Sequence, residues 1–142
     1  MTIITFRFTN MLCYNNHNMP TNPSPPETIS RVFSALDTPA RIQILLAIGT
    51  GEACVCHLEA SLGLRQAYIS QQLMELREQG LVSSRREGRY IFHRIEKPEV
   101  LDLVRLAAHM SGLPAEALTV ADHSDCECPN CAAGGPASIE KE

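Results

Sequence analysis

The spacing of apolar residues changes twice between residues 27 and 113, and these changes limit the possible folds more than any other feature. Up to Gly80, apolar side chains recur every three or four residues, which is typical of amphipathic helices. After Gly80 the period changes, and we expect two short strands joined at Glu87-Gly88 in the stretch LVSSRREGRYIFHRI. Helical spacing then returns in PEVLDLVRLAAHM. The pattern predicts a mainly α fold with one β-hairpin.

Two helices before the hairpin are arranged as in DNA-binding proteins. A short helix is expected over about residues 53–62, and Gly63 ends it. A longer helix follows, with Ile69, Leu73 and Leu76 facing inward and Gly80 as its end. A short helix, a tight turn and a longer second helix form the DNA-binding helix-turn-helix. With the hairpin as its wing, the predicted fold is a winged helix-turn-helix.

Three further helices are expected around this motif. The first covers ETISRVFSAL, and the second has Asp37 as its N-cap and Pro39 in its first turn. The last covers PEVLDLVRLAAHM. We expect a homodimer formed through the first and last helices, because the last helix carries more apolar residues than one small domain needs to bury. These residues are Val100, Leu101, Val104, Leu106 and Met110.

The periodic region divides the chain into three parts. Residues 1–26 are polar and contain Pro20, Pro23, Pro25 and Pro26, so a disordered extension without helix is expected. Residues 27–113 form the predicted DNA-binding and dimerisation domain. Residues 114–142 contain cysteines, glycine and acidic residues, and a flexible tail is expected there.

Charge is distributed unevenly along the chain. The net charge of −4 over 142 residues argues against non-specific binding of nucleic acid. However, residues 65–94 contain six arginines and three glutamates, a net charge of +3, as phosphate contacts require. The sequence has no apolar run long enough for a membrane span and no evident secretory signal, so a cytoplasmic protein without membrane contact is expected.

Candidate DNA contacts lie on the longer helix and the hairpin. Four side chains of this helix point away from its apolar face: Gln66, Tyr68, Ser70 and Gln71. Glutamine can read adenine through two hydrogen bonds, serine can contact base or phosphate, and the tyrosine can pack on the sugar backbone. Phosphate contacts are expected from Arg65, Arg85, Arg86 and Arg89. The alternative is that the hairpin arginines form only a solvated surface.

The stretch EACVCHLE places Cys54 and Cys56 at the start of the expected short helix. A buried free cysteine is often simply a small apolar residue. Residues i and i+2 of a helix point in nearly opposite directions, so packing does not easily explain both thiols. A disulfide between them would be strained. An ion held by both would therefore distort the first turn of the helix, and this distortion would act as a switch on DNA binding.

A second group of cysteines occurs in the tail, within CECPNC: Cys126, Cys128 and Cys131. This segment has no core pattern, so packing does not explain three cysteines there, and C-P-x-C resembles a metal-binding knuckle. Two thiolates are too few for a soft ion. We expect the tail to supply the missing ligands, from the same or the partner subunit, or else to bind an ion by itself.

These motifs together resemble the arsenic-repressor (ArsR/SmtB) family of metal-sensing winged-helix repressors. The resemblance covers about residues 28–112 and rests on DTPAR, CVC and ISQQLMELREQGLVSSRREGR in this order and spacing. It implies a dimer that binds operator DNA without metal and releases it when metal binds. The family usually has Ser or Thr where Arg65 stands, so one helix cap is lost.

The resemblance also suggests ligand sets, which this sequence matches incompletely. The arsenic-sensing branch has a third cysteine three residues after the pair, where Glu59 stands here. The cadmium-sensing branch uses N-terminal cysteines, which correspond here to Cys13 and His17; we favour the tail over these two. The zinc-sensing branch has Asp-x-His on the last helix. Asp102 is followed by Val104 instead, so His109 is expected at an interface or the surface.

The expected inducer is a soft ion held by thiolates, either As(III) or Sb(III), or else Cd(II) or Pb(II), with Zn(II) also considered. One alternative function is a thiol-based redox sensor on the same fold, which would respond through a disulfide in the tail. An enzyme is disfavoured, because no βαβ pattern accompanies the C-x-x-C and no catalytic arrangement of side chains stands out. No catalytic residue is therefore predicted.

Overall fold

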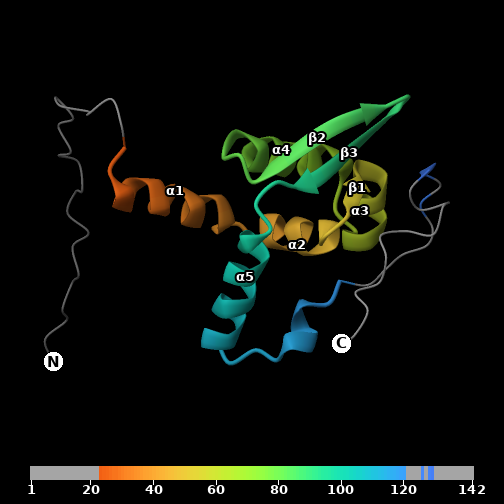
Figure 1. The fold of residues 1–142 in the computed structure, drawn as a ribbon. Coiled ribbons are helices and arrows are strands. Elements are labelled where there is room, and N and C mark those ends of the chain that lie inside the picture. Colours follow the sequence, from red (N-terminus) through yellow and green to blue (C-terminus); the bar gives the residue numbers. More distant parts are fainter. Residues whose placement is uncertain (1–22, 121–125, 127, 130–142) are drawn as a thin grey trace, which may run out of the picture.

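The computed structural model describes residues 23–120, 126, 128 and 129, and it has the predicted winged helix-turn-helix fold (Figure 1). Helices α3 and α4 form the helix-turn-helix, and strands β2 and β3 form the wing. No helix in these residues is long and apolar enough to cross a membrane. The elements are α1 (Pro25–Leu36), α2 (Pro39–Ile48), β1 (Glu52–Cys54), α3 (Val55–Leu62), α4 (Gln66–Glu78), β2 (Val82–Glu87), β3 (Tyr90–Ile95), α5 (Glu99–Met110) and the 3₁₀ helix η1 (Ala115–Leu118).

Helix α2 lies at the centre of the fold. It contacts α1, α3, α4, α5 and the strands β1 and β3. Ile44, Leu45 and Ile48 are at most 1% exposed, as are Ile69 and Leu73 on the inward face of α4. Burying each such side chain contributes about 1.5–3 kcal/mol to stability. The core therefore holds the two helices of the DNA-binding motif against α2.

The sheet has three antiparallel strands in the order β1-β3-β2. Glu87 pairs with Tyr90, so the wing turns at residues 88–89, one residue later than the sequence indicated. Gly88 has a φ of 59°, a conformation that favours glycine. Strand β1 was not predicted from the sequence. It adds Cys54 to the sheet directly opposite Phe92.

Helix α1 begins inside the segment where no helix was expected. Ser24 is its N-cap: the Ser24 N–H donates to Glu27 Oε2 at 2.7 Å, and the Glu27 N–H donates to Ser24 Oγ at 3.5 Å. The prolines at residues 25 and 26 fit because the first turn of a helix needs no N–H donors. Asp37 ends α1, and the N-cap of α2 is Thr38 rather than Asp37.

The surplus apolar surface agrees with the expectation at Leu106 and Met110 and differs from it at the other three residues. Val100, Leu101 and Val104 are 4–6% exposed and belong to the core of the single chain, so they are not available to a partner. The exposed apolar side chains on the outer helices are Ile29, Phe33, Leu106 and Met110, which are 55–79% exposed. Figure 1 shows α1 and α5 extending away from the helix-turn-helix and the sheet.

Candidate metal centre and DNA-binding surface

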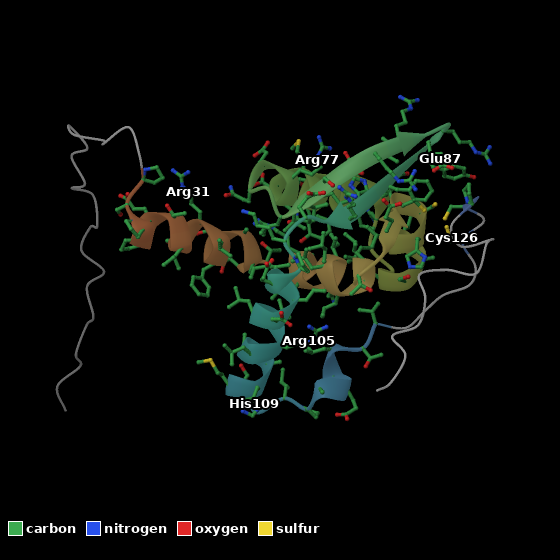
Figure 2. The ribbon with its side chains drawn as sticks, viewed as in Figure 1. Arg31, Arg77, Glu87, Arg105, His109 and Cys126 are labelled. Carbon is green, nitrogen blue, oxygen red and sulfur yellow. The ribbon has the colours of Figure 1, made fainter. Side chains whose placement is uncertain are left out.

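Four cysteine side chains meet where β1 leads into α3. The sulfur atoms of Cys54, Cys56, Cys126 and Cys128, here called the cysteine cluster, all lie within 4.8 Å of one another. Cys54 Sγ lies 2.7 Å from Cys56 Sγ and 3.8 Å from Cys126 Sγ, and the Cys56 and Cys126 sulfurs are 3.2 Å apart. Only Cys56 is exposed. The tail cysteines thus approach the pair of their own chain (Figure 2).

The backbone at Cys54 explains why the two sulfurs of the pair come together. Cys54 is not inside a helix: it ends β1 and is the N-cap of α3, with φ −87° and ψ 164°. Its sulfur accepts a hydrogen bond from the His57 N–H at 3.4 Å. The expected helix over residues 53–62 therefore starts two residues later. The premise that both cysteines lie inside the helix was wrong, because Cys54 precedes it.

The donor set fits a soft metal or metalloid ion. Thiolates are the ligands that such ions prefer, and sulfurs in a tetrahedral zinc–thiolate site are about 3.8 Å apart. Burial, followed by the hydrogen bond with Cys56, raises the pKa of Cys54, and burial also raises the pKa of Cys126. Both residues are therefore neutral thiols in the absence of an ion. Binding an ion would release their protons.

Among the described residues, His57 and His109 are not part of this cluster. Cys13, His17 and Cys131 lie outside the described residues. His57 is buried, and its Nε2 lies 3.4 Å from Ser61 Oγ. Figure 2 shows His109 at the far end of α5, away from Cys126.

The wing forms one wall of the cysteine cluster. Phe92 is 1% exposed and packs with Cys54, Cys126 and Cys128, while Tyr90 is partly buried against the same group. Phe92 and Cys54 are also direct partners in the sheet. The cluster is therefore in contact with β3 of the wing as well as with the start of α3.

The outer face of α4 carries the side chains expected to contact DNA. All five are exposed: Arg65, Gln66, Tyr68, Ser70 and Gln71. Residue 65 is the N-cap of α4, and its side chain makes no capping hydrogen bond, as expected for an arginine at this position. The opposite face of the helix is buried against the core. The polar face is thus held outward on a rigid element.

The three wing arginines differ in their contacts. Arg86 Nε donates to the Gly88 carbonyl at 3.1 Å, and Arg89 Nη2 donates to the Tyr90 hydroxyl at 2.8 Å, both near the tip. Arg85 instead donates to both carboxylate oxygens of Glu52 at 2.6–3.0 Å, and it also pairs with Glu87. The hydrogen bonds with Glu52, then those with Glu87, raise the pKa of Arg85. Its charge is largely neutralised within the protein.

Two polar residues in the interior were missed from the sequence. Arg41, in the DTPAR motif, donates to the buried Gln72 side chain at 2.9 Å and to the Ser34 and Ala35 carbonyls at 3.2 and 3.3 Å. It ties the end of α1 to the middle of α4. His93 on β3 is 4% exposed, and its Nδ1 has no hydrogen-bond partner among the described residues. Burial, with a smaller effect of Arg77, lowers the pKa of His93 to about 4.

Comparison with known proteins agrees with this architecture. Residues 38–84 match the family described as bacterial regulatory protein, arsR family. The chain is 38% identical to the arsenic resistance transcriptional regulator ArsR1 of Pseudomonas putida over 98 residues, covering 64% of this chain and 76% of that protein. It is 35% identical to the transcriptional repressor SmtB homolog of Synechocystis, covering 58% of this chain and 62% of the relative, which is less than two thirds of the relative's length.

A solved structure extends the likeness to three dimensions. It is the homodimeric winged helix-turn-helix DNA-binding domain Mb0332 from Mycobacterium bovis, with a TM-score of 0.55 and 28% identity, covering 66% of this chain and 91% of that one. The proteins that match are transcriptional regulators, not enzymes. The fold and the sequence likeness show that this chain belongs to the arsR family of bacterial regulatory proteins, which bind DNA through a winged helix-turn-helix.

Proposed function

We propose that this protein is a homodimeric repressor that releases its operator when a soft ion binds to the thiolates of the cysteine cluster. The observation that carries this proposal is the meeting of four sulfurs within 4.8 Å at the start of α3, the first helix of the DNA-binding motif. The likeness to an arsenic resistance regulator supports it. Cys131 is a further candidate ligand in the same tail.

Double-stranded operator DNA is the proposed partner. The exposed face of α4 offers Gln66 and Gln71 to base edges, and Ser70, Tyr68 and Arg65 to bases or the backbone. Arg86 and Arg89 at the wing tip are the proposed phosphate contacts, and the ion pairs of Arg85 give that residue a different role. Because phosphate contacts dominate affinity, binding should weaken with rising salt.

The repressor acts as a dimer in this proposal. The exposed apolar side chains of α1 and α5 provide surface for a second copy, and the matched Mycobacterium bovis domain is homodimeric. A two-fold dimer would present two α4 helices to successive major grooves, as helix-turn-helix dimers do.

The proposed inducers are ions that prefer sulfur. As(III) and Sb(III) are satisfied by three thiolates, and Cd(II) or Pb(II) by three or four, so the four-cysteine cluster suits either class; Zn(II) also fits a tetrahedral set. The redox-sensing alternative is not favoured. Four converging sulfurs exceed the two that a disulfide needs, and one of the matched relatives is named for arsenic resistance.

Substitution of the pair tests the proposal. The Cys54→Ser/Cys56→Ser double variant leaves only two of the four cluster thiolates, so it should keep operator affinity without an ion and lose release by arsenite or Cd(II). The reason is that an ion shifts DNA binding only through its differential affinity for the two states. Binding to a labelled operator and sulfur-to-metal absorption are followed together. Cys13→Ser, in the N-terminal segment, is the matched control and should respond as the unmodified protein does. A full response in the Cys54→Ser/Cys56→Ser double variant would refute the proposal.

The contribution of the tail is tested separately. Deleting residues 122–142 removes the tail cysteines while leaving the described helix-turn-helix and wing. The shortened protein should bind operator as before but need more ion for release. An unchanged ion affinity would exclude the tail cysteines as ligands and restrict the site to the pair.

A further inference from the structure

We infer that Glu52 and Arg85 are positioning residues that brace the wing against the cysteine cluster, so that the state of the cluster reaches DNA through the wing. The inference rests on the proposed function. It assigns a role to an ion pair that neither DNA contact nor ion binding requires. It also identifies the wing, and not only α4, as the element that responds.

A row of three side chains crosses the sheet next to the cluster. Phe92 on β3 lies opposite Cys54 on β1 and opposite Arg85 on β2. Directly opposite residues in a sheet point to the same face, so the three form one continuous row. The Arg85 guanidinium carbon lies 4.8 Å from the centre of the Phe92 ring. The Phe92 ring therefore lies between Cys54 of the cluster and Arg85 of the wing, and it packs against both.

The second aromatic residue of this wall makes a parallel connection to the wing tip. Tyr90 packs against the cluster, and the Arg89 guanidinium carbon lies 5.0 Å from the centre of the Tyr90 ring. Arg89 also donates a hydrogen bond to the Tyr90 hydroxyl at 2.8 Å. The proposed phosphate contact thus rests on a side chain that encloses the cysteines. A movement of the tyrosine ring would displace Arg89.

The ion pair of Glu52 and Arg85 holds the two outer strands of the sheet at a fixed separation. Glu52 lies on β1, two residues before Cys54, while Arg85 lies on β2 with β3 between the two strands. The two-pronged contact at 2.6–3.0 Å therefore links the outer strands across the central one. Paired arginine–carboxylate contacts are geometrically specific. The contact holds the cysteine-bearing strand and the wing in one register.

The sulfur spacing indicates why the wing should respond. Sulfurs that share one ion are held at distances set by that ion, about 3.8 Å in a tetrahedral zinc-like site. Cys54 is fixed in the sheet opposite Phe92, and the tail cysteines lie against the same ring, so a rearrangement of the sulfurs around an ion acts on Phe92 and Tyr90. The Glu52–Arg85 contact transfers this rearrangement to the wing as a whole.

Glu52→Gln tests the brace, because it removes the carboxylate charge while keeping the shape of the side chain. The measured quantity is the ratio of operator dissociation constants with and without Cd(II). Allosteric ratios are commonly about 5–150, and we expect Glu52→Gln to lower this ratio at least about fivefold. The sulfur-to-metal absorption and its stoichiometry should be unchanged. An unaltered ratio would overturn the inference.

Glu96→Gln is the matched control. It breaks the exposed ion pair between Glu96 and Arg94 Nε, 2.9 Å long, beside the same hairpin. Arg94 lies opposite Glu52 in the sheet, but Glu96→Gln leaves the Glu52–Arg85 contact in place, so the ratio should be that of the unmodified protein. An equal loss in Glu96→Gln and Glu52→Gln would overturn the inference, since any weakening of the hairpin would then suffice. In a double-mutant cycle, Glu52→Gln and Arg85→Gln should be clearly non-additive, because they remove the same contact.

Amide hydrogen exchange gives a readout independent of DNA. Addition of Cd(II) to the full-length protein should change exchange in residues 82–95, and Glu52→Gln should reduce this change. A change confined to residues 66–78 would overturn the wing route and leave thiolate sensing in place. Failure of the proposed function is distinguishable, because the unmodified protein would then show no sulfur-to-metal absorption at all.

Discussion

The backbone conformation of one residue decides how the thiols of residues 52–59 can act. In a helix Cys54 and Cys56 would diverge, but the extended N-cap conformation of Cys54 brings their sulfurs to 2.7 Å. The cap also uses the sulfur as an acceptor for the His57 N–H, a role more often filled by an oxygen. A thiolate that binds an ion keeps lone pairs, so it can still accept this hydrogen bond. The same atom thus takes part in helix capping and in the proposed metal site.

His93 should make stability depend on pH. Its folded-state pKa of about 4 lies below the ordinary 6.5, so the neutral form is the one that folds. The stabilisation from neutral His93 is fully present above about pH 6.5 and is lost as the pH falls towards 4. At pH 5 the free energy of unfolding should be lower by up to about 2 kcal/mol. Urea unfolding at pH 7 and pH 5 measures it. His93→Gln should show a smaller difference between the two pH values, and an equal difference would contradict the prediction.

Arg41 should matter more for stability than an exposed arginine. Arg41→Ala leaves the buried Gln72 oxygen without its donor, which costs about 1–3 kcal/mol. Arg105→Ala is the control, since it removes only an exposed ion pair with Asp102 and should cost about 1 kcal/mol or less. The denaturant midpoints of the two variants give the two losses, provided that the dependence of the unfolding free energy on denaturant concentration is the same in both. Similar losses would show that the link between α1 and α4 is not significant.

At the scale of elements, the wing combines two tasks. Its tip presents Arg86 and Arg89 to solvent, while Phe92 and Tyr90 on β3 close the cysteine cluster. Alternation along β3 makes this possible, because successive side chains point to opposite faces. Phe92 faces the cysteines, and the neighbouring His93 is buried separately. A single strand thus connects the proposed sensor with the proposed DNA contacts.

The wing arginines should differ in their effect on salt dependence. Arg86→Ala and Arg89→Ala should weaken operator and random DNA about equally, and each should reduce the salt slope by about one. Arg85→Ala should leave the slope nearly unchanged, because Glu52 and Glu87 already neutralise this charge. Titrations at several salt concentrations measure the slopes. An equal reduction for all three would mean that Arg85 exchanges its carboxylates for phosphate on DNA.

The spacing of apolar residues predicted those helices and strands that are long enough to show a repeating pattern. Helix α4 has three inward residues at helical spacing, and all are at most 1% exposed as expected. Strand β1 has only three residues, too few for an alternation to be recognised, and without it Cys54 was placed in the helix. The sequence also showed which cysteines to consider. Their meeting depends on contacts between residues about 70 positions apart, which no local pattern can indicate.

At the scale of the whole molecule, the basic and acidic parts of the chain have separate places. The basic region comprises α4 and the wing, while residues 116–142 carry a net charge of −5. Cys126 and Cys128 belong to this acidic segment and pack against Phe92 of the wing. Like charges repel, so an ion that holds the tail cysteines at the wing would favour release of DNA phosphate by electrostatics as well as by movement of the wing.

The proposed dimer is also a property of the whole molecule. Phe33 on α1 and Met110 on α5 are 56% and 79% exposed, and a second copy would cover them. Phe33→Glu should convert the dimer to a monomer, because a buried unpaired carboxylate is costly. Operator affinity should then fall, since two linked α4 helices bind better than one. Ile91→Glu, at an apolar side chain of the wing that is 46% exposed, is the control for oligomeric state. Light scattering at micromolar concentration decides: a monomeric unmodified protein, or a dimeric Phe33→Glu variant, would contradict the prediction.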